Sequence, residues 1–161
     1  MHSTIIDSPL GNIKIECDDE HLLKITILHP EGERQSHPRG VRWSRGLKIL
    51  KRATKQLKEY FSGRRKKFSL PISFNKLGGT RFETIVWMAL QKIPYGKTLS
   101  YKDLAKIVRH PKACRAAGNA NGKNPLSIVI PCHRVVASSG YIGGYSSGVW
   151  RKKRLLTLEN P

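Results

Sequence analysis

Three residues near the end of the chain combine a nucleophile with a base and a cation: Cys132, His133 and Arg134, between Pro131 and Val135. A cysteine attacks as its thiolate, and a neighbouring base or positive charge favours that form. Because neighbours on an extended segment point to opposite faces, we expect His133 to act on the thiol through a bridging water. The pattern predicts a reactive thiol at Cys132, and a buried core cysteine is the alternative.

The segments on either side of this motif predict a pocket. The apolar run 126–130 predicts a strand that holds Cys132 rigidly, and Pro131 fixes the approach of the backbone. Residues 138–148 are rich in glycine, which lets backbone groups approach a ligand closely. A long glycine turn without a ligand is the alternative.

The other two cysteines predict structural roles. Cys17 continues the apolar face of a predicted strand, so we expect a buried thiol there. Cys114, beside Arg115, is expected to be a small packing residue rather than a second nucleophile. An odd number of cysteines without close pairing indicates neither a disulfide framework nor a zinc cluster, and we expect no metal.

The charge of the chain points to a polyanionic partner. Its 161 residues include 30 Lys and Arg against 11 Asp and Glu, a net charge of +19, which favours nucleic acid over a membrane surface or the ribosome. The excess lies in residues 34–79 and 80–161. No apolar run approaches the roughly 20 residues of a membrane span, and the first residues do not resemble a signal peptide. We therefore expect a cytoplasmic protein with no membrane partner.

The sequence predicts an α/β (α+β) fold in two domains, residues 1–76 and 77–161. Three alternating runs, 4–7, 12–17 and 22–28, predict a small antiparallel sheet, and residues 29–42 predict a loop. Apolar residues at helical spacing predict an amphipathic basic helix over 44–61, followed by the charged loop 64–67. The basic face is interpreted first as a solvated surface, with phosphate contact as the alternative.

The second domain is predicted to be mostly helical. A capping box at Thr80 and Glu83 begins a helix that runs to about Lys92. Helices over 101–108 and from Pro111 to about Gly118 form a candidate helix-turn-helix, and a last helix covers 149–158. Small residues surround Arg115 on the second of these helices, so it could lie close to DNA while the long cation reaches into the duplex. The alternative is that the alanines pack on the protein and Arg115 is merely exposed.

Many ordered motifs between Gly79 and Glu159 resemble the O6-alkylguanine-DNA alkyltransferases, also called methylated-DNA-protein-cysteine methyltransferases. The N-terminal half resembles them loosely, through residues 8–11 and its strand pattern. The resemblance implies a ribonuclease-H-like N-terminal domain and a winged-helix-like C-terminal domain. The matching stretches are Gly79-Thr80-Arg81-Phe82, Val86-Trp87, Ile93-Pro94-Tyr95-Gly96, Ser100-Tyr101, Arg115-Ala116, Asn124-Pro125, Ile130-Pro131-Cys132-His133-Arg134-Val135, Gly143-Gly144-Tyr145-Ser146 and Glu159.

The resemblance implies DNA repair by irreversible transfer of an alkyl group to Cys132. Glu159 and His133 would withdraw the thiol proton through water, and the alkyl group would come from O6 of a flipped-out guanine. O4-alkylthymine is a further possible substrate. The thioether product is stable, so each molecule would act once, and no cofactor is implied. Double-stranded DNA with an alkylated guanine is the implied partner of a protein expected to be monomeric, with cooperative assembly on DNA left open.

The resemblance also implies roles for the residues around Cys132. Tyr101 would press on the DNA backbone and bond the departing base, and Arg115 would fill the space left in the stack. Asn124 would link the helix-turn-helix to the active-site segment. The implied DNA contacts are completed by Ser100, Lys112 and Ala116. The implied base pocket comprises Cys132, Val135, Tyr145, Ser146, Gly143, Gly144 and Trp87.

Two other classes of function are compatible with parts of the sequence. A module that recognises damaged bases without chemistry would lack the acceptor cysteine, which is present here. A basic regulator or nucleic-acid-binding protein would use the helix-turn-helix or the 44–67 block without a reactive thiol.

Overall fold

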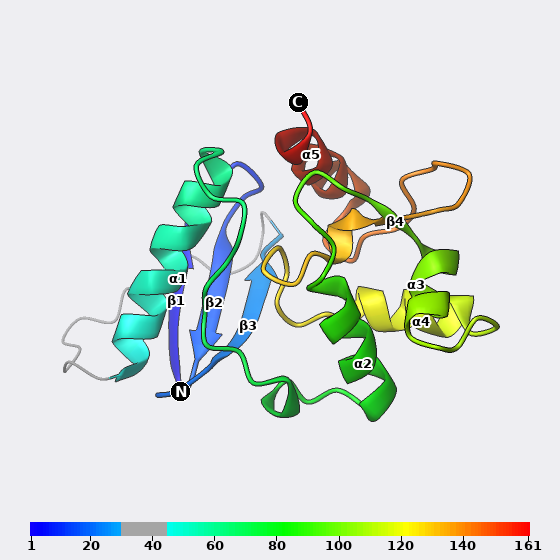
Figure 1. The fold of residues 1–161 in the computed structure, drawn as a ribbon. Helices are drawn as coiled ribbons and strands as arrows, with labels where there is room; N and C mark the ends of the chain where they lie inside the picture. The colour runs from blue at the N-terminus through cyan, green and yellow to red at the C-terminus, as the bar shows by residue number, and fades with distance from the viewer. Residues whose placement is uncertain (30–44) are drawn as a thin grey trace. The chain divides into compact units, whose positions relative to one another are not determined.

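The computed structural model describes residues 1–29 and 45–161, which form two compact units, Met1–Leu77 and Gly78–Pro161 (Figure 1). Together they confirm the predicted mixed α/β class. No helix in the described ranges is long and apolar enough to cross a membrane.

The first unit is built on a three-stranded antiparallel sheet. Its strands β1 (His2–Ile6), β2 (Ile13–Cys17) and β3 (Leu22–Ile27) lie in the order β1-β2-β3. Alternate residues of β2 are buried, and α1 (Arg45–Phe61) packs against β1 and β2 (Figure 1). The predicted strands and basic helix are confirmed to within two residues. The loop predicted at 29–42 lies outside the described residues apart from residue 29.

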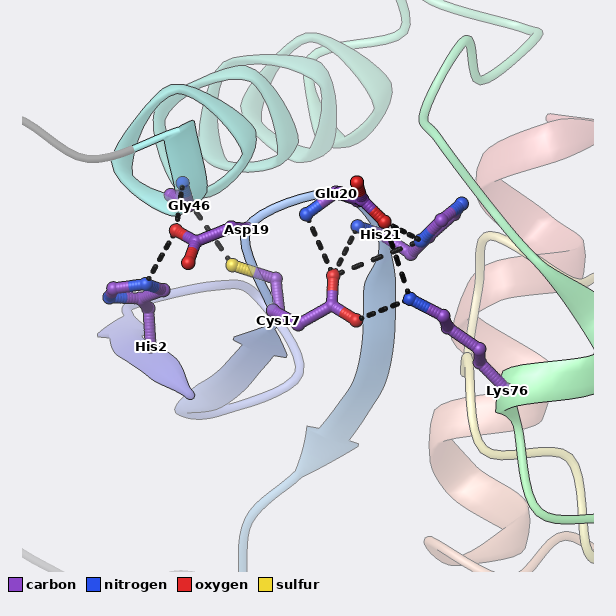
Figure 2. A network of polar contacts seen from close by, with 8 residues as sticks. His2, Cys17, Asp19, Glu20, His21, Gly46 and Lys76 are labelled. Atoms are coloured by element: carbon purple, nitrogen blue, oxygen red, sulfur yellow. Dashed lines mark hydrogen bonds and ion pairs between the residues drawn. The ribbon is translucent and has the colours of Figure 1, made fainter.

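Cys17 is a buried part of this packing, as the strand pattern predicts. Its thiol donates a hydrogen bond of 3.4 Å to the carbonyl of Gly46 at the start of α1. Burial, with the nearby charges of Asp18 and Asp19, raises the pKa of Cys17 to about 11. Asp19 also accepts from the Gly46 amide at 3.3 Å and pairs with His2 at 3.0 Å, so the β2–β3 turn is tied to the helix (Figure 2).

The second unit contains the other helices. The capping box at Thr80 and Glu83 begins α2 (Arg81–Leu90), as predicted. Ser100 caps α3 (Tyr101–Ile107), and α5 (Val149–Glu159) ends the chain. Between them lies α4 (Cys114–Gly122), which begins three residues later than predicted because residues 111 and 112 form a turn. A short 3-10 helix, η1 (Phe74–Lys76), precedes this unit.

The apolar run before the reactive motif differs from the prediction, because it is a buried turn rather than a strand. The amide of Ile130 bonds the carbonyl of Leu126 at 2.9 Å, and that of Val129 bonds Ser127 at 2.9 Å. Ile128 has φ 74°, a strained conformation for a β-branched residue. The chain then enters η2 (Cys132–Arg134) and β5 (Val135–Val136), which pairs in parallel with β4 (Leu99–Ser100).

Candidate active site

Cys132 is held at the start of η2 with 5% of its surface exposed. Its amide donates to the Ile130 carbonyl at 2.8 Å, and its own carbonyl accepts from the Asn121 side chain at 3.3 Å. Burial raises the pKa of the Cys132 thiol, while Asn124, Tyr145 and the charge of Lys152 oppose this rise. The effect of burial is the largest, so the neutral thiol is favoured, and a reaction needs a group that accepts the thiol proton.

His133 is placed to be that group. Its Nε2 lies 2.8 Å from Oε1 of Glu159, and both side chains are buried. Because a carboxylate oxygen only accepts, Nε2 carries the hydrogen and Nδ1 keeps its lone pair. Nδ1 has no partner among the described residues. Burial lowers the pKa of His133 and favours the neutral imidazole, which can take a proton.

Arg134 has a different role from the one its sequence position indicates. Its guanidinium donates two hydrogen bonds to Glu159, from Nε to Oε2 at 2.8 Å and from Nη2 to Oε1 at 2.9 Å. A third bond of 2.6 Å joins Nη1 to the carbonyl of Ile93. The charge of Arg134 therefore neutralises the carboxylate and lowers the pKa of His133, rather than standing beside the thiol as a bare cation. This ion pair is a feature that the sequence reasoning missed.

An open cavity of about 450 Å³ reaches Cys132. Four of the other predicted pocket or site residues line it: Tyr101, Gly144, Tyr145 and Ser146. Its size is within the range of small-ligand sites. The complete lining is Tyr101, Gly118, Asn119, Asn121, Gly122, Lys123, Cys132, Gly144, Tyr145 and Ser146.

Three residues predicted for the base pocket are not among those that line the cavity. Trp87 is buried, and its indole N–H donates to the Ala120 carbonyl at 2.9 Å, so it supports α4. Val135 is fully buried in β5. Gly143, at φ 75°, packs on Tyr101, where an added Cβ would lie 3.2 Å from the ring and hydroxyl.

Lys152 is a second feature of the site that sequence reasoning missed. It is fully buried on α5, and its Nζ donates to the Gly144 carbonyl at 3.1 Å and to the Tyr101 hydroxyl at 3.4 Å. Burial lowers the pKa of Lys152 to about 8, against the raising effect of Cys132. Its helical spacing from Leu155 and Glu159, both buried, was the available signal in the sequence.

Asn124 closes the turn that leads to the thiol. Its Nδ2 donates to the Ile130 carbonyl at 2.7 Å, and its Oδ1 accepts from the Leu126 amide at 2.9 Å. A direct link from α4 to the thiol segment comes from Asn121, which the sequence reasoning did not select.

Models of two protein domains match the chain: "6-O-methylguanine DNA methyltransferase, DNA binding domain" over residues 81–161 and "6-O-methylguanine DNA methyltransferase, ribonuclease-like domain" over residues 1–74. The chain belongs to the 6-O-methylguanine DNA methyltransferase family. The resemblance found in the sequence is thus confirmed, and it extends over the N-terminal half.

Individual relatives of this methyltransferase match over nearly their whole lengths. The methylated-DNA–protein-cysteine methyltransferase of Methanosarcina acetivorans is 38% identical over 159 residues, 99% of this chain and 98% of the relative. That of Methanosarcina barkeri is 40% identical, over 99% and 97%. The crystal structure of Mycobacterium tuberculosis OGT in complex with DNA has a TM-score of 0.84 at 37% identity, covering 99% of this chain and 92% of that one.

The helix-turn-helix of the methyltransferase presents the predicted DNA-contact residues. Helices α3 and α4 pack together, with Arg115 and Ala116 exposed in the first turn of α4 and Lys112 exposed just before it. Ser100 caps α3 by accepting from the Asp103 amide at 3.0 Å. Cys114 is exposed, so the prediction that it packs inside the protein is wrong.

Proposed function

We propose that this protein repairs DNA by direct reversal, moving an alkyl group such as methyl from O6 of guanine to the sulfur of Cys132. The observation that carries the proposal is a buried Cys132 at an open cavity, followed in the sequence by His133, which is hydrogen-bonded to the buried Glu159, in a member of the methyltransferase family. Relatives named methylated-DNA–protein-cysteine methyltransferases support it.

The proton of the thiol moves to Nδ1 of His133 through a bridging water. Glu159 fixes the imidazole through Nε2 and stabilises the imidazolium that forms. The thiolate of Cys132 then attacks the alkyl carbon, forming the S–C bond as the C–O6 bond breaks. The bonding electrons leave with guanine, which takes up a proton. The thioether is stable, so each molecule acts once and needs no cofactor.

The leaving guanine is stabilised by donors on the cavity wall. The hydroxyl of Tyr145 is buried and close enough to the Cys132 thiol to affect its pKa, and Ser146 lies next to Tyr145 in the lining. A donor directed at O6 favours the transition state because negative charge develops on that oxygen.

The DNA is held by the second unit. A base inside a duplex must leave the stack before a buried thiol can reach it. Arg115 fills the space that the base leaves in the stack, and Tyr101 lies at the cavity. Ser100, Lys112 and Ala116 contact the DNA backbone. Residues 77–161 thus form the DNA-binding and acceptor domain, and 1–76 form the N-terminal α/β domain of a monomeric, cytoplasmic protein.

A labelled-substrate experiment tests the proposal. Duplex DNA with a radiolabelled O6-methylguanine is incubated with the wild type, with Cys132→Ser and with Cys114→Ser, the control for loss of an exposed thiol. One label per molecule should appear on the wild type and on Cys114→Ser, and none on Cys132→Ser. Label that stays on DNA with wild type, or moves equally well to Cys132→Ser, contradicts the proposal.

A further inference from the structure

Helix α1 has two faces of opposite character. Seven of its residues are buried, and they point toward the rest of the first unit: Gly46, Ile49, Leu50, Ala53, Gln56, Leu57 and Tyr60. The exposed face carries six cations at intervals of one or three residues: Arg45, Lys48, Lys51, Arg52, Lys55 and Lys58. These six residues define the basic face, in which Arg52 also donates to the Ser69 hydroxyl at 2.6 Å, whereas all the residues that α1 buries are uncharged.

The charges of the basic face are not balanced within the helix. Glu59 is the acidic residue of α1, and its Oε2 is 2.7 Å from Nε of Arg65 in the following loop. Lys48, Lys55 and Lys58 form no ion pair within residues 1–29 and 45–161. Like charges three or four residues apart weaken a helix. We therefore expect the basic face to bind a partner molecule that carries negative charge.

A groove runs along this face. It has a volume of about 570 Å³ and lies between α1 and β1, the edge strand of the sheet. Four cations line it, Lys51, Lys55, Lys58 and Arg64, together with Glu59, whose charge is paired with Arg65. Arg64 belongs to the loop after α1, so that loop extends the positive surface beyond the end of the helix.

We propose that the basic face of α1 binds the phosphate backbone of duplex DNA, independently of sequence, as a DNA contact additional to the helix-turn-helix. From Lys48 to Lys58 the helix rises about 15 Å, a length over which duplex DNA carries about nine phosphates. Cations on flexible side chains at this spacing can meet several of them. The choice of DNA over RNA rests on the proposed function.

A membrane surface fits this face less well. Helices that bind lipid insert their apolar side into the bilayer. The apolar side of α1 is already buried, and none of the large exposed hydrophobic residues belongs to this helix. The face thus offers charge without an apolar surface to insert.

The test compares charge-matched variants of the full chain for binding to unmethylated duplex DNA at several salt concentrations. One variant carries Lys48→Gln, Lys55→Gln and Lys58→Gln, and a second replaces the same three lysines by arginine. A control removes three other exposed lysines by Lys24→Gln, Lys92→Gln and Lys153→Gln. Each phosphate contact contributes about 0.9 to the slope of log affinity against log salt. Between 50 and 200 mM salt, the factor by which DNA affinity falls should therefore be about 40 times smaller for the glutamine variant than for the wild type.

The arginine variant should keep the wild-type slope, and the control should keep most of it. Equal slopes for the glutamine variant and the control would overturn the inference. The inference would also be overturned if the protein preferred RNA or anionic vesicles to DNA, and if the glutamine variant lost that binding while its DNA binding stayed unchanged. Protection of Lys48, Lys55 and Lys58, but not Lys24, from acetylation when DNA is added to wild type is the second readout, independent of any variant. Because neither measurement involves alkyl transfer, failure here is distinct from failure of the proposed function.

Discussion

Two opposite charges affect the basicity of His133, that of Glu159 at the end of α5 and that of Arg134 in η2. Glu159 raises the pKa of His133 and Arg134 lowers it, while burial lowers it most. A general base must be neutral before it acts. Arg134 therefore acts on the reaction through its hydrogen bonds to Glu159. Its positive charge offsets the carboxylate, which would otherwise favour the protonated imidazole.

Replacing Arg134 by Met should slow alkyl transfer most at the acidic end of the pH range. Without the guanidinium, the pKa of His133 rises, and the protonated imidazole cannot accept the thiol proton. Below that pKa, each unit by which it rises lowers the rate about tenfold, and the loss should recover as the pH is raised. The measurement is the single-turnover rate of transfer from methylated duplex DNA between pH 6 and 9.

The double variant Arg134→Met with Glu159→Gln is the control for this shift. Removing one partner of a buried pair costs about 3 to 5 kcal/mol, whereas removing both charges leaves no isolated carboxylate. Its rate falls because the imidazole is less well oriented, but its pH profile should not move upward. An unshifted profile for the single variant would show that Arg134 does not govern the base.

Cys114 and Cys17 should differ in their reactivity toward a small alkylating reagent such as iodoacetamide. Cys114 is exposed, whereas Cys17 is completely buried and its pKa is raised to about 11. Because the thiolate is the reactive form, Cys114 should be modified first and Cys17 only after unfolding. Peptide mass spectrometry over time checks the order, and Cys114→Ser should remove the fast phase. Early modification of Cys17 in the folded protein would refute the order.

At the level of elements, local patterns in the sequence predicted much of the fold. The capping box fixed the start of α2, and alternation in β2 matched its buried face. The run 126–130 was wrongly predicted as a strand because an apolar run indicates burial without indicating backbone shape. The two hydrogen bonds of Asn124, to Leu126 and Ile130, close that segment into a turn, and such contacts between a side chain and the backbone have no periodic signal.

The active site was predicted unevenly for the same reason. Cys132, His133 and Glu159 carry motif signals, and the structure brings the last two within 2.8 Å. The bidentate contact of Arg134 and the burial of Lys152 depend on how α5 packs against η2. The spacing of Lys152 from Leu155 and Glu159 was a signal for its burial, but no spacing in the sequence indicates the contact between Arg134 and Glu159.

Variants in the first turn of α4 and just before it should distinguish base flipping from general attraction to DNA. Arg115 and Lys112 are both exposed, but only Arg115 is proposed to enter the stack. Arg115→Ala should slow transfer from duplex DNA much more than transfer from the free alkylated base. Lys112→Ala should weaken binding to damaged and undamaged duplex alike and reduce the salt slope by about 0.9. Rates for both substrates and a salt titration distinguish these effects; equal losses of Arg115→Ala on both substrates would exclude the flipping role.

At the scale of the molecule, two buried groups in different units give the stability opposite dependences on pH. In the second unit, burial lowers the pKa of Lys152 from 10.5 to about 8. In the first unit, burial raises the pKa of Cys17 from 9.0 to about 11. Stability rises with pH where the unfolded chain binds more protons than the folded one. Lys152 thus makes its unit more stable as the pH rises from 8 to 10.5, and Cys17 makes its unit less stable between 9 and 11.

The variants Lys152→Met and Cys17→Ala should each remove one of these dependences. Against wild type, the change in unfolding free energy caused by Lys152→Met should vary between pH 8 and 10.5 by at most about 1.4 kcal/mol per pH unit, the value for one proton. The exposed neighbour change Lys153→Met is the control for the loss of one lysine from α5. Denaturant unfolding at several pH values measures each effect. If the two units unfold separately, each dependence should appear in its own transition, and if they unfold together, both should appear in one. A pH-independent difference for Lys152→Met would mean that the lysine keeps its ordinary pKa despite its burial.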